Sequence, residues 1–180
     1  MKRVGFLVIV FVTAAVWGAR AGQAPTAQAQ APPAEVVPPS EIPPSAQAEI
    51  AKLKGGQKKW PPLFPSPFAK KVFENERIIV WDETLTSEHR LHKHIRDIIA
   101  FYVQDDGDLM SIDAKGNVTI GRAGTRYGGA EVPHVSAYVK AGLGPHSTAA
   151  VDPKKGTRRV FWVEFKGTEP PDCKEWSTAC

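Results

Sequence analysis

Three of the five histidines of this 180-residue chain, His89, His92 and His94, lie within six positions, directly before the apolar run of residues 98–103. Side chains two positions apart on a strand point to the same face, so an extended segment places His92 and His94 side by side. Imidazole nitrogens are common ligands of divalent transition metals. The pair therefore indicates the start of a metal site at the entrance to a buried strand.

A simpler interpretation stays open for each histidine. His92 and His94 would then be polar side chains at the exposed beginning of a strand, and His146 would be a turn residue after Pro145. We expect His89 to lie in an exposed loop. We expect His134, which follows a proline in a polar loop, to be structural or solvated.

The elements that position these histidines are expected to be strands. Short segments rich in β-branched and aromatic residues occur at intervals of 8–15 residues, with no strong helical pattern between them. The predicted strands are residues 72–73, 77–85, 98–103, 109–113, 118–120, 136–140, 146–151 and 159–166. This pattern is typical of an all-β sandwich or barrel. The run 98–103 is apolar on both faces, so we expect it to lie between two packed layers.

Other side chains in this region have plainer interpretations. Trp81, Phe101, Tyr102 and Trp162 are expected in the core, because aromatic side chains pack there more often than they bind ligands. The extended apolar segment 60–68 is expected to pack along the outside of the core. The basic residues between positions 154 and 159 are expected to form a solvated corner.

The N-terminus has the pattern of a secretory signal. Lys2 and Arg3 precede an uncharged apolar run of residues 4–17, and Ala19-Arg20-Ala21 supplies small residues for cleavage after position 21. The run is shorter than the roughly 20 residues that span a bilayer, which disfavours the alternative of an uncleaved anchor. We expect residues 1–21 to be removed, no stable membrane span to remain, and the protein to be periplasmic or secreted.

Charge argues against a nucleic-acid partner. The formal net charge is +4, but Lys2, Arg3 and Arg20 all lie in the expected signal, which contains no acids. The remaining chain would carry +1. A nearly neutral chain has no electrostatic footprint for nucleic acid.

Two flanking segments complete the predicted organisation. Residues 22–59 are rich in Ala, Gln and Pro and are expected to form a disordered linker, with a short helix near 45–53 that ends at Gly55-Gly56. A β-barrel follows at residues 60–167, and residues 168–180 form a tail. Cys173 and Cys180 are expected to form one disulfide in an exported protein; a redox or metal-binding pair is the alternative.

Several of these segments together resemble the small single-domain cupins. The resemblance covers residues 68–167 and is carried by residues 72–81, by His92-x-His94, by the Gly-centred hairpin at 114–117, by Gly144-Pro145-His146 and by residues 160–166. It implies a conical β-barrel of the jelly-roll type, also called a double-stranded β-helix. It also implies a metal or a small ligand in the mouth of that barrel, and it is compatible with a homodimer.

The resemblance also implies a ligand set. It carries His92, His94 and His146 over as metal ligands, with Asp97 as the nearest carboxylate; Glu83 and Glu131 are unranked alternatives for the acid. Fe, Mn, Ni, Cu and Zn all suit such ligands, and the sequence does not choose among them. Two hypotheses stay open: a metal-dependent enzyme acting on a small polar or oxygenated molecule, and a non-catalytic module that binds a small molecule or a partner.

Overall fold

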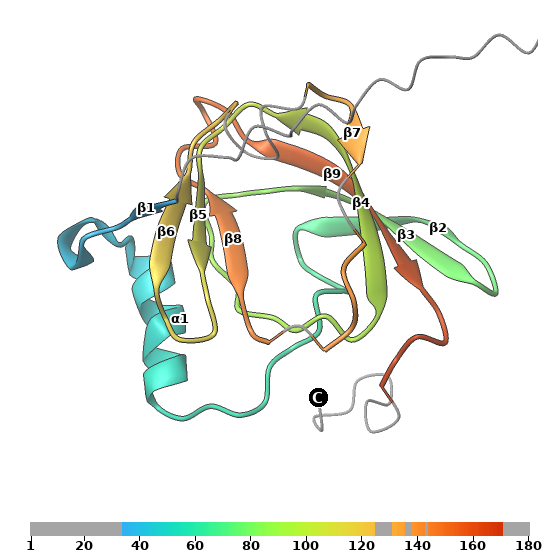
Figure 1. The fold of residues 1–180 in the computed structure, drawn as a ribbon, viewed down its shortest axis with the longest axis horizontal. Coiled ribbons are helices and arrows are strands. Elements are labelled where there is room, and N and C mark those ends of the chain that lie inside the picture. The colour runs from blue at the N-terminus through green and yellow to red at the C-terminus, as the bar shows by residue number, and fades with distance from the viewer. Residues whose placement is uncertain (1–33, 125–130, 136–137, 143, 171–180) are drawn as a thin grey trace, which may run out of the picture.

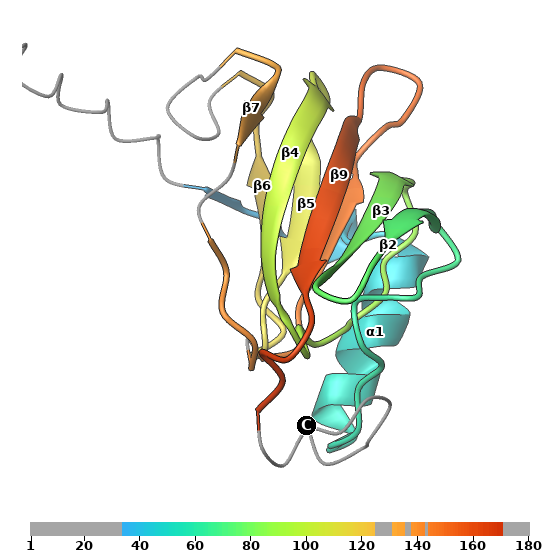
Figure 2. The ribbon, with the colours of Figure 1, turned by 90° about the vertical axis from the view of Figure 1, so that its right-hand side faces the viewer.

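Two antiparallel β-sheets face each other across the molecule in the computed structural model, which describes residues 34–124, 131–135, 138–142 and 144–170 (Figures 1 and 2). The first sheet has the order β1 (Glu35–Val36), β6 (Val118–Gly121), β5 (Leu109–Ile112) and β8 (Ser147–Ala150). The second has the order β2 (Ala69–Glu74), β3 (Ile78–Thr84), β9 (Arg158–Phe165), β4 (Asp97–Asp105) and β7 (His134–Val135). The predicted all-β class is confirmed.

The path of the chain between the sheets is that of a jelly roll. After β3 in the second sheet, the chain pairs with the first sheet through a bridge between His92 and His146. It then enters β4 of the second sheet, β5 and β6 of the first, β7 of the second, β8 of the first and β9 of the second. This alternation winds both sheets into one barrel. The predicted double-stranded β-helix is therefore confirmed by the strand order.

The inner face of the second sheet carries large side chains from β3 and β9. Burial alternates along β3, where Ile79, Trp81 and Glu83 point inward, each 8% exposed or less. Trp81 lies opposite Trp162 of β9 in the antiparallel register. The ring of Phe64 stacks on Trp81, with ring centroids 5.0 Å apart. The segment 60–68 thus contributes to the core, and its predicted place on the outside is wrong because its apolar side chains fit between the sheets.

The outer face of the second sheet is different. In β4, Ala100 and Tyr102 are buried, whereas Phe101 and Val103 are 44% and 39% exposed. The prediction that residues 98–103 lie between two packed layers is therefore wrong. A run that is apolar on both faces requires cover only on the side turned towards the core, and none of the described helices lies over the other side (Figure 2).

A helix covers the outer face of the first sheet instead (Figure 1). Helix α1 (Pro44–Lys54) begins with proline at its first position, where a missing N–H costs nothing, and ends at Gly55. It follows a short 3₁₀ turn, η1 (Pro39–Glu41). Ala46 and Ile50 of the helix are buried together with Met110 and Ile112 of β5.

The prediction of a disordered linker is consequently wrong for residues 34–59. The segment contains β1, which pairs with β6, and α1, whose apolar side chains close the core on that side. The expected helix at 45–53 is confirmed, but its packing depends on contacts far along the chain. Residues 22–33, the expected signal at 1–21 and the two cysteines lie outside the described residues.

The structure also tests two local predictions, the hairpin at 114–117 and the strand at 136–140. The expected hairpin at 114–117 is confirmed: Gly116 adopts a φ of 83°, and the Asp113 carboxylate accepts hydrogen bonds from the backbone of Lys115 and Asn117. The strand expected at 136–140 is not found in the described part, where β7 ends at Val135 and Val139 forms a single bridge with Ile98. No helix among the described residues has both the length and the hydrophobicity to cross a bilayer.

Candidate metal centre

The segment that carries the two neighbouring histidines runs along the edge of the first sheet. The backbone N–H of His92 donates to the carbonyl of His146 (3.0 Å), and the N–H of His146 donates back to the carbonyl of His92 (3.1 Å). On its other side, the Lys93 carbonyl accepts from the Leu63 N–H (2.8 Å). These backbone bonds place His146 beside His92, with His94 two positions further along the same extended segment.

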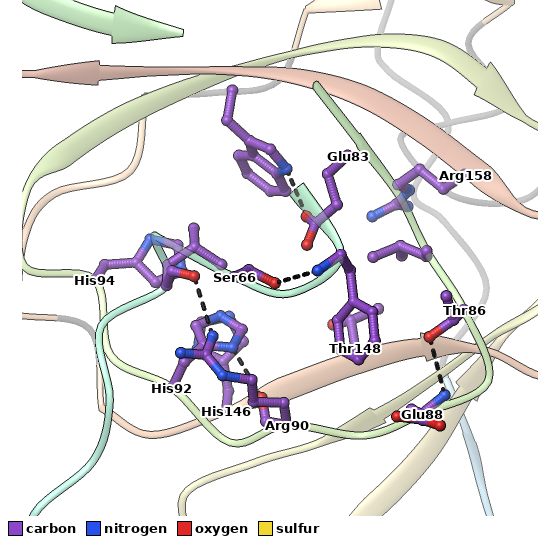
Figure 3. Close-up of a pocket in the computed structure, with 14 residues that line it drawn as sticks. Ser66, Glu83, Thr86, Glu88, Arg90, His92, His94, His146, Thr148 and Arg158 are labelled. Atoms are coloured by element: carbon purple, nitrogen blue, oxygen red, sulfur yellow. Dashed lines mark hydrogen bonds between the residues drawn. The ribbon is translucent and has the colours of Figure 1, made fainter. Parts of the chain in front are cut away.

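The three imidazoles converge. One ring nitrogen from each of His92, His94 and His146 lies within 4.8 Å of the other two, and the ring centroids are 4.6–5.6 Å apart (Figure 3). Two nitrogens bound at about 2.1 Å to one ion lie roughly 3–3.5 Å apart, so small ring rotations would bring the three onto a single ion. The structure therefore brings together all three histidines that the sequence analysis proposed.

Backbone carbonyls orient two of the rings. The Nδ1 of His92 lies 2.9 Å from the Arg90 carbonyl, and the Nδ1 of His146 lies 3.3 Å from the Gly144 carbonyl. A carbonyl only accepts, so each Nδ1 carries the proton and each Nε2 keeps its lone pair. Metal-binding histidines typically have such a partner on the ring nitrogen that does not bind the metal.

His94 is the clearest sign that a ligand belongs here. Its side chain is 5% exposed, and neither of its ring nitrogens has a hydrogen-bond partner among the described residues. A buried polar atom left without a partner costs about 1–3 kcal/mol. A metal ion at the centre of the three rings would satisfy one of these nitrogens, so the residues present fit a metal.

The electrostatics favour neutral rings. Burial is the main cause that lowers the pKa of all three imidazoles, and His146 adds to the effect at both His92 and His94. The pKa of His94 falls to about 3, and that of His92 falls well below 6.5. The three rings are therefore neutral at pH 7, which is the form that binds a metal.

A cavity of about 70 Å³ adjoins the histidines (Figure 3). One part of its wall is apolar and includes Leu63, Phe68, Leu85 and Trp162. The other part is polar. It is lined by Ser66, Glu83, Thr86, Glu88, Arg90, Thr148 and Arg158, together with the three histidines. The cavity therefore offers both apolar and polar contacts.

Glu83 is the buried carboxylate of this cavity. It projects inward from β3, is 5% exposed, and its Oε2 accepts a hydrogen bond of 2.8 Å from the indole N–H of Trp162. Burial raises its pKa, against the opposing effects of Trp162 and of the Arg90 charge. Glu83 is not part of the converging cluster. The other alternative acid, Glu131, is exposed and does not line the cavity.

Asp97, the proposed fourth ligand, lies elsewhere. Its carboxylate accepts a hydrogen bond from the Ala141 N–H (2.7 Å) and another from the Tyr138 hydroxyl. Asp97 begins β4, and the residue after it, Ile98, points into the core, so strand alternation turns Asp97 outward. The prediction that Asp97 reaches the metal centre is wrong.

His89 was expected in an exposed loop, and that expectation is also wrong. Its side chain is 7% exposed, and its Nδ1 lies 3.2 Å from the hydroxyl of Ser147. The same hydroxyl accepts a bond of 2.9 Å from the Arg90 N–H. Burial lowers the pKa of His89 to about 4. His134 stacks on Tyr102, with centroids 4.8 Å apart, and is not a member of the cluster.

The two arginines of the cavity are already engaged. Arg90 donates to the carbonyls of Pro62 (2.9 Å) and Leu63 (3.1 Å). Arg158 is 6% exposed, donates to Asp105, and lies with its guanidinium 4.6 Å from the centre of the Tyr102 ring. The expectation of a solvated basic corner is therefore wrong for Arg158, because the alternation of β9 turns it inward. It is confirmed for Lys154, Lys155 and Arg159, which are exposed.

No family model matches the chain, and no curated protein is similar to it. Among solved structures, it is similar to a cupin domain from Bordetella pertussis (15% identity, 61% of this chain and 98% of that chain, TM-score 0.38). It is also similar to a cupin-2 domain protein from Shewanella frigidimarina (14%, 54% and 79%, 0.34) and to an RmlC-like cupin from Desulfovibrio desulfuricans (13%, 57% and 91%, 0.35). At these identities and TM-scores, no site residue or activity carries over. The jelly-roll strand order described above is what confirms the predicted cupin-like fold.

Proposed function

We propose that this chain is an exported protein that binds one divalent transition metal through His92, His94 and His146, and that acts on a small polar or oxygenated molecule in the adjoining cavity. The observation that carries this proposal is the convergence of three imidazoles, one of which has two buried nitrogens without a partner among the described residues. The fold supports it, since the mouth of a small barrel is a common place for a ligand.

Different residues of the site would bind the metal, orient the imidazole rings and exclude water. The three histidines would hold the ion, and the carbonyls of Arg90 and Gly144 would keep two of the rings in the binding tautomer. A divalent ion with three protein ligands has an open position, at which it supplies Lewis-acid polarisation of an oxygen atom. The apolar side chains of Leu63, Phe68 and Leu85 would exclude water from one side of the bound molecule.

The proposal of export rests on residues 1–21 alone. A basic start, a short apolar run and the Ala-Arg-Ala sequence before position 22 support cleavage and release into the periplasm or the medium. An exported site would meet a different supply of metals from one in the cytosol, and the choice among Fe, Mn, Ni, Cu and Zn depends on that supply as well as on the ligands.

A non-catalytic binding module is the second candidate. It is favoured by one observation: among the residues that the structure describes, no carboxylate joins the three histidines, and Asp97 faces outward. In this case the barrel mouth would hold a small ligand, with or without a metal.

The first test is the metal content of the protein, expressed from the full-length chain without a histidine tag and purified from the periplasm. About one equivalent of a transition metal is expected. A His92→Ala/His94→Ala double variant should lose the metal while keeping the circular dichroism spectrum of the wild type. A His134→Ala variant, altered outside the cluster, should keep it.

Two results would contradict the proposed metal centre. If the native protein contains no metal, and takes up none from Mn(II), Fe(II), Co(II), Ni(II), Cu(II) or Zn(II), then the histidines do not form a metal centre and the binding module becomes the leading candidate. Retention of the metal by the double variant would place the ion elsewhere on the chain.

A further inference from the structure

The side chain of Glu83 is held by only one of its two oxygens. Oε2 accepts the indole N–H of Trp162, and no described cation lies within ion-pair distance of the carboxylate. The other oxygen, Oε1, has no hydrogen-bond partner among the described residues. It is also not one of the fully buried polar atoms, so part of its surface is accessible. Figure 3 shows this oxygen turned away from the indole and into the cavity. A buried carboxylate thus presents one open oxygen to any molecule bound there.

The indole keeps the carboxylate in this orientation. Trp162 is itself held by ring contacts with Phe64 (6.2 Å between centroids) and Tyr102 (6.5 Å). Glu83 and Trp162 lie on the hydrogen-bonded strands β3 and β9, so neither can swing far from the other. The open oxygen is therefore positioned before any ligand arrives.

Three roles would explain such a carboxylate. As a metal ligand it would have to leave Trp162 and join the histidine cluster, to which it does not belong. As a structural ion-pair partner it would need a cation close by, and Arg90 instead donates to the carbonyls of Pro62 and Leu63. A proton-transfer group needs an open, oriented oxygen that faces the bound molecule, and Glu83 presents one in the cavity that the three histidines also line.

We propose that Glu83 is the proton-transfer group of this cavity: its open oxygen takes the proton from a hydroxyl group or water molecule that occupies the open position of the His92–His94–His146 centre. The inference rests on the proposed function. In this step one O–H bond of the ligand breaks and one O–H bond forms at Oε1. The electron pair stays on the ligand oxygen, the carboxylate becomes a neutral acid, and nothing is oxidised or reduced. The reverse step returns the proton.

The ligand class follows from this role. A molecule that gives up a proton at an oxygen atom next to the metal is an alcohol, a hydroxy ketone, a hydroxamic acid or water. The raised pKa of Glu83, caused mainly by burial, makes it a stronger base than an exposed glutamate. The other titratable groups that line the cavity are Glu88, Arg90, Arg158 and the three histidines.

Acetohydroxamic acid is a suitable probe, because it is small and neutral at pH 7 and binds transition metals as an anion after losing one proton. Its binding to the Co(II)-loaded, full-length-derived protein is measured by calorimetry at pH 7 and pH 8 in two buffers with different ionisation enthalpies. The difference between the buffers counts the protons released to solvent. The wild type should release clearly fewer protons than a variant without this carboxylate, because Glu83 takes up the proton.

A Glu83→Gln variant should release about one proton per probe molecule and bind it about 10–100-fold more weakly, the range set by losing one charge-assisted hydrogen bond. Gln keeps an oxygen for Trp162, so the fold should survive, as a thermal unfolding scan would verify. Co(II) affinity should stay within about threefold of the wild type. A Glu83→Asp variant, which keeps the acid, should restore part of the proton uptake and covers the case in which Glu83→Gln fails to fold.

Glu88→Gln is the matched control, because Glu88 lines the same cavity but is exposed. It should leave the proton count unchanged. Release of a full proton by the wild type, no binding of the probe to Co(II)-loaded protein, or an equal loss of proton uptake in Glu88→Gln would each overturn the role of Glu83. A large loss of Co(II) affinity in Glu83→Gln would overturn it in favour of a metal ligand. If the wild type binds no Co(II) at all, the proposed metal centre itself fails.

Discussion

The inner face of the second sheet carries the same pair of side chains twice. Trp162 donates its indole N–H to Glu83 at 2.8 Å, and Trp81 donates its indole N–H to Glu164, also at 2.8 Å. The two tryptophans face each other across β3 and β9. The pairs are therefore related by the approximate twofold symmetry of an antiparallel ladder, one at the end of the sheet that faces the cavity and the other at the opposite end.

Their surroundings differ. Glu164 is 2% exposed and forms an ion pair of 3.6 Å with Arg96, which also contacts Glu169. Glu83 forms no such ion pair with a described residue and turns one oxygen into the cavity that the histidines line (Figure 3). The same local geometry thus contributes to stability where a cation is paired with the carboxylate. Where no described cation is paired with it, the carboxylate is available to a ligand in the cavity.

The largest effect on stability is expected at the end of the sheet that carries Glu164, where Arg96 is paired with the carboxylate. Replacing Arg96 with Met leaves Glu164 buried beside Trp81 without its cation, which should cost about 3–5 kcal/mol in the free energy of unfolding. Urea denaturation of the metal-free protein measures this cost. Adding Glu164→Gln to Arg96→Met should recover a large part of the loss. A cost below about 1 kcal/mol would show that the ion pair between Arg96 and Glu164 does not stabilise the fold.

At the cavity end, stability and binding should move in opposite directions. His94→Leu removes two buried nitrogens that have no partner in the described part of the chain, so the free energy of unfolding of the metal-free protein should stay level or rise by about 1 kcal/mol. Co(II) affinity should fall by about 100-fold or more, since one of three ligands is lost. Denaturation without metal measures the free energy of unfolding, and a separate Co(II) titration measures the metal affinity. A metal-free protein destabilised by more than about 2 kcal/mol would mean that His94 is needed for packing.

The buried histidines and the buried glutamates, Glu83 and Glu164, should respond oppositely to pH. The pKa of His94 is lowered to about 3 and that of His89 to about 4. Below about pH 6.5 these histidines therefore become protonated in the unfolded chain but stay neutral in the folded chain. Stability should therefore fall as pH drops from about 6.5 towards 4, by at most about 1.4 kcal/mol per pH unit for each histidine.

The raised pKa of Glu164 has the opposite sign. Its contribution favours the folded state below its ordinary pKa of 4.5 and is lost as the pH rises through the shifted value. Denaturation of the metal-free protein at half-unit pH steps measures the sum. His94→Leu should flatten the decline between pH 6.5 and 4, and an unchanged slope would contradict the assignment of the decline to the histidine cluster.

The smallest effect is a difference between the two tryptophans. Trp81→Phe and Trp162→Phe each remove one N–H donor and keep an aromatic ring. Glu83 lines the cavity beside the histidines and can recruit water from it, whereas Glu164 does not line that cavity, so Trp81→Phe should be more destabilising by about 1 kcal/mol. Equal losses in urea denaturation would mean that the two carboxylates are equally accessible to water.

The sequence was most informative where local periodicity decides the outcome. The period of two predicted that His92 and His94 share a face, and they do. The same rule could have found Glu83, because Ile79, Trp81 and Glu83 are alternate residues of one strand and the first two are plainly apolar. Asp97 was misjudged because nearness in sequence outweighed alternation, which turns it away from the core.

Other features depend on contacts that no local pattern contains. The burial of His89 depends on Ser147, and the packing of α1 depends on Met110 and Ile112 of β5. Residues 34–59 looked like a linker because their composition is poor in large apolar groups. A few well-placed side chains were enough, since the sheet supplies most of the apolar surface.

The backbone bridge between His92 and His146 has a consequence for the order of folding. The two residues lie 54 positions apart in the chain, so the bridge closes a long loop and the entropy of that closure must be overcome before any metal site exists. A partly folded chain that lacks β8 has at most two of the three imidazoles in place. Metal should therefore bind after the barrel has closed, leaving the refolding rate unchanged while slowing unfolding.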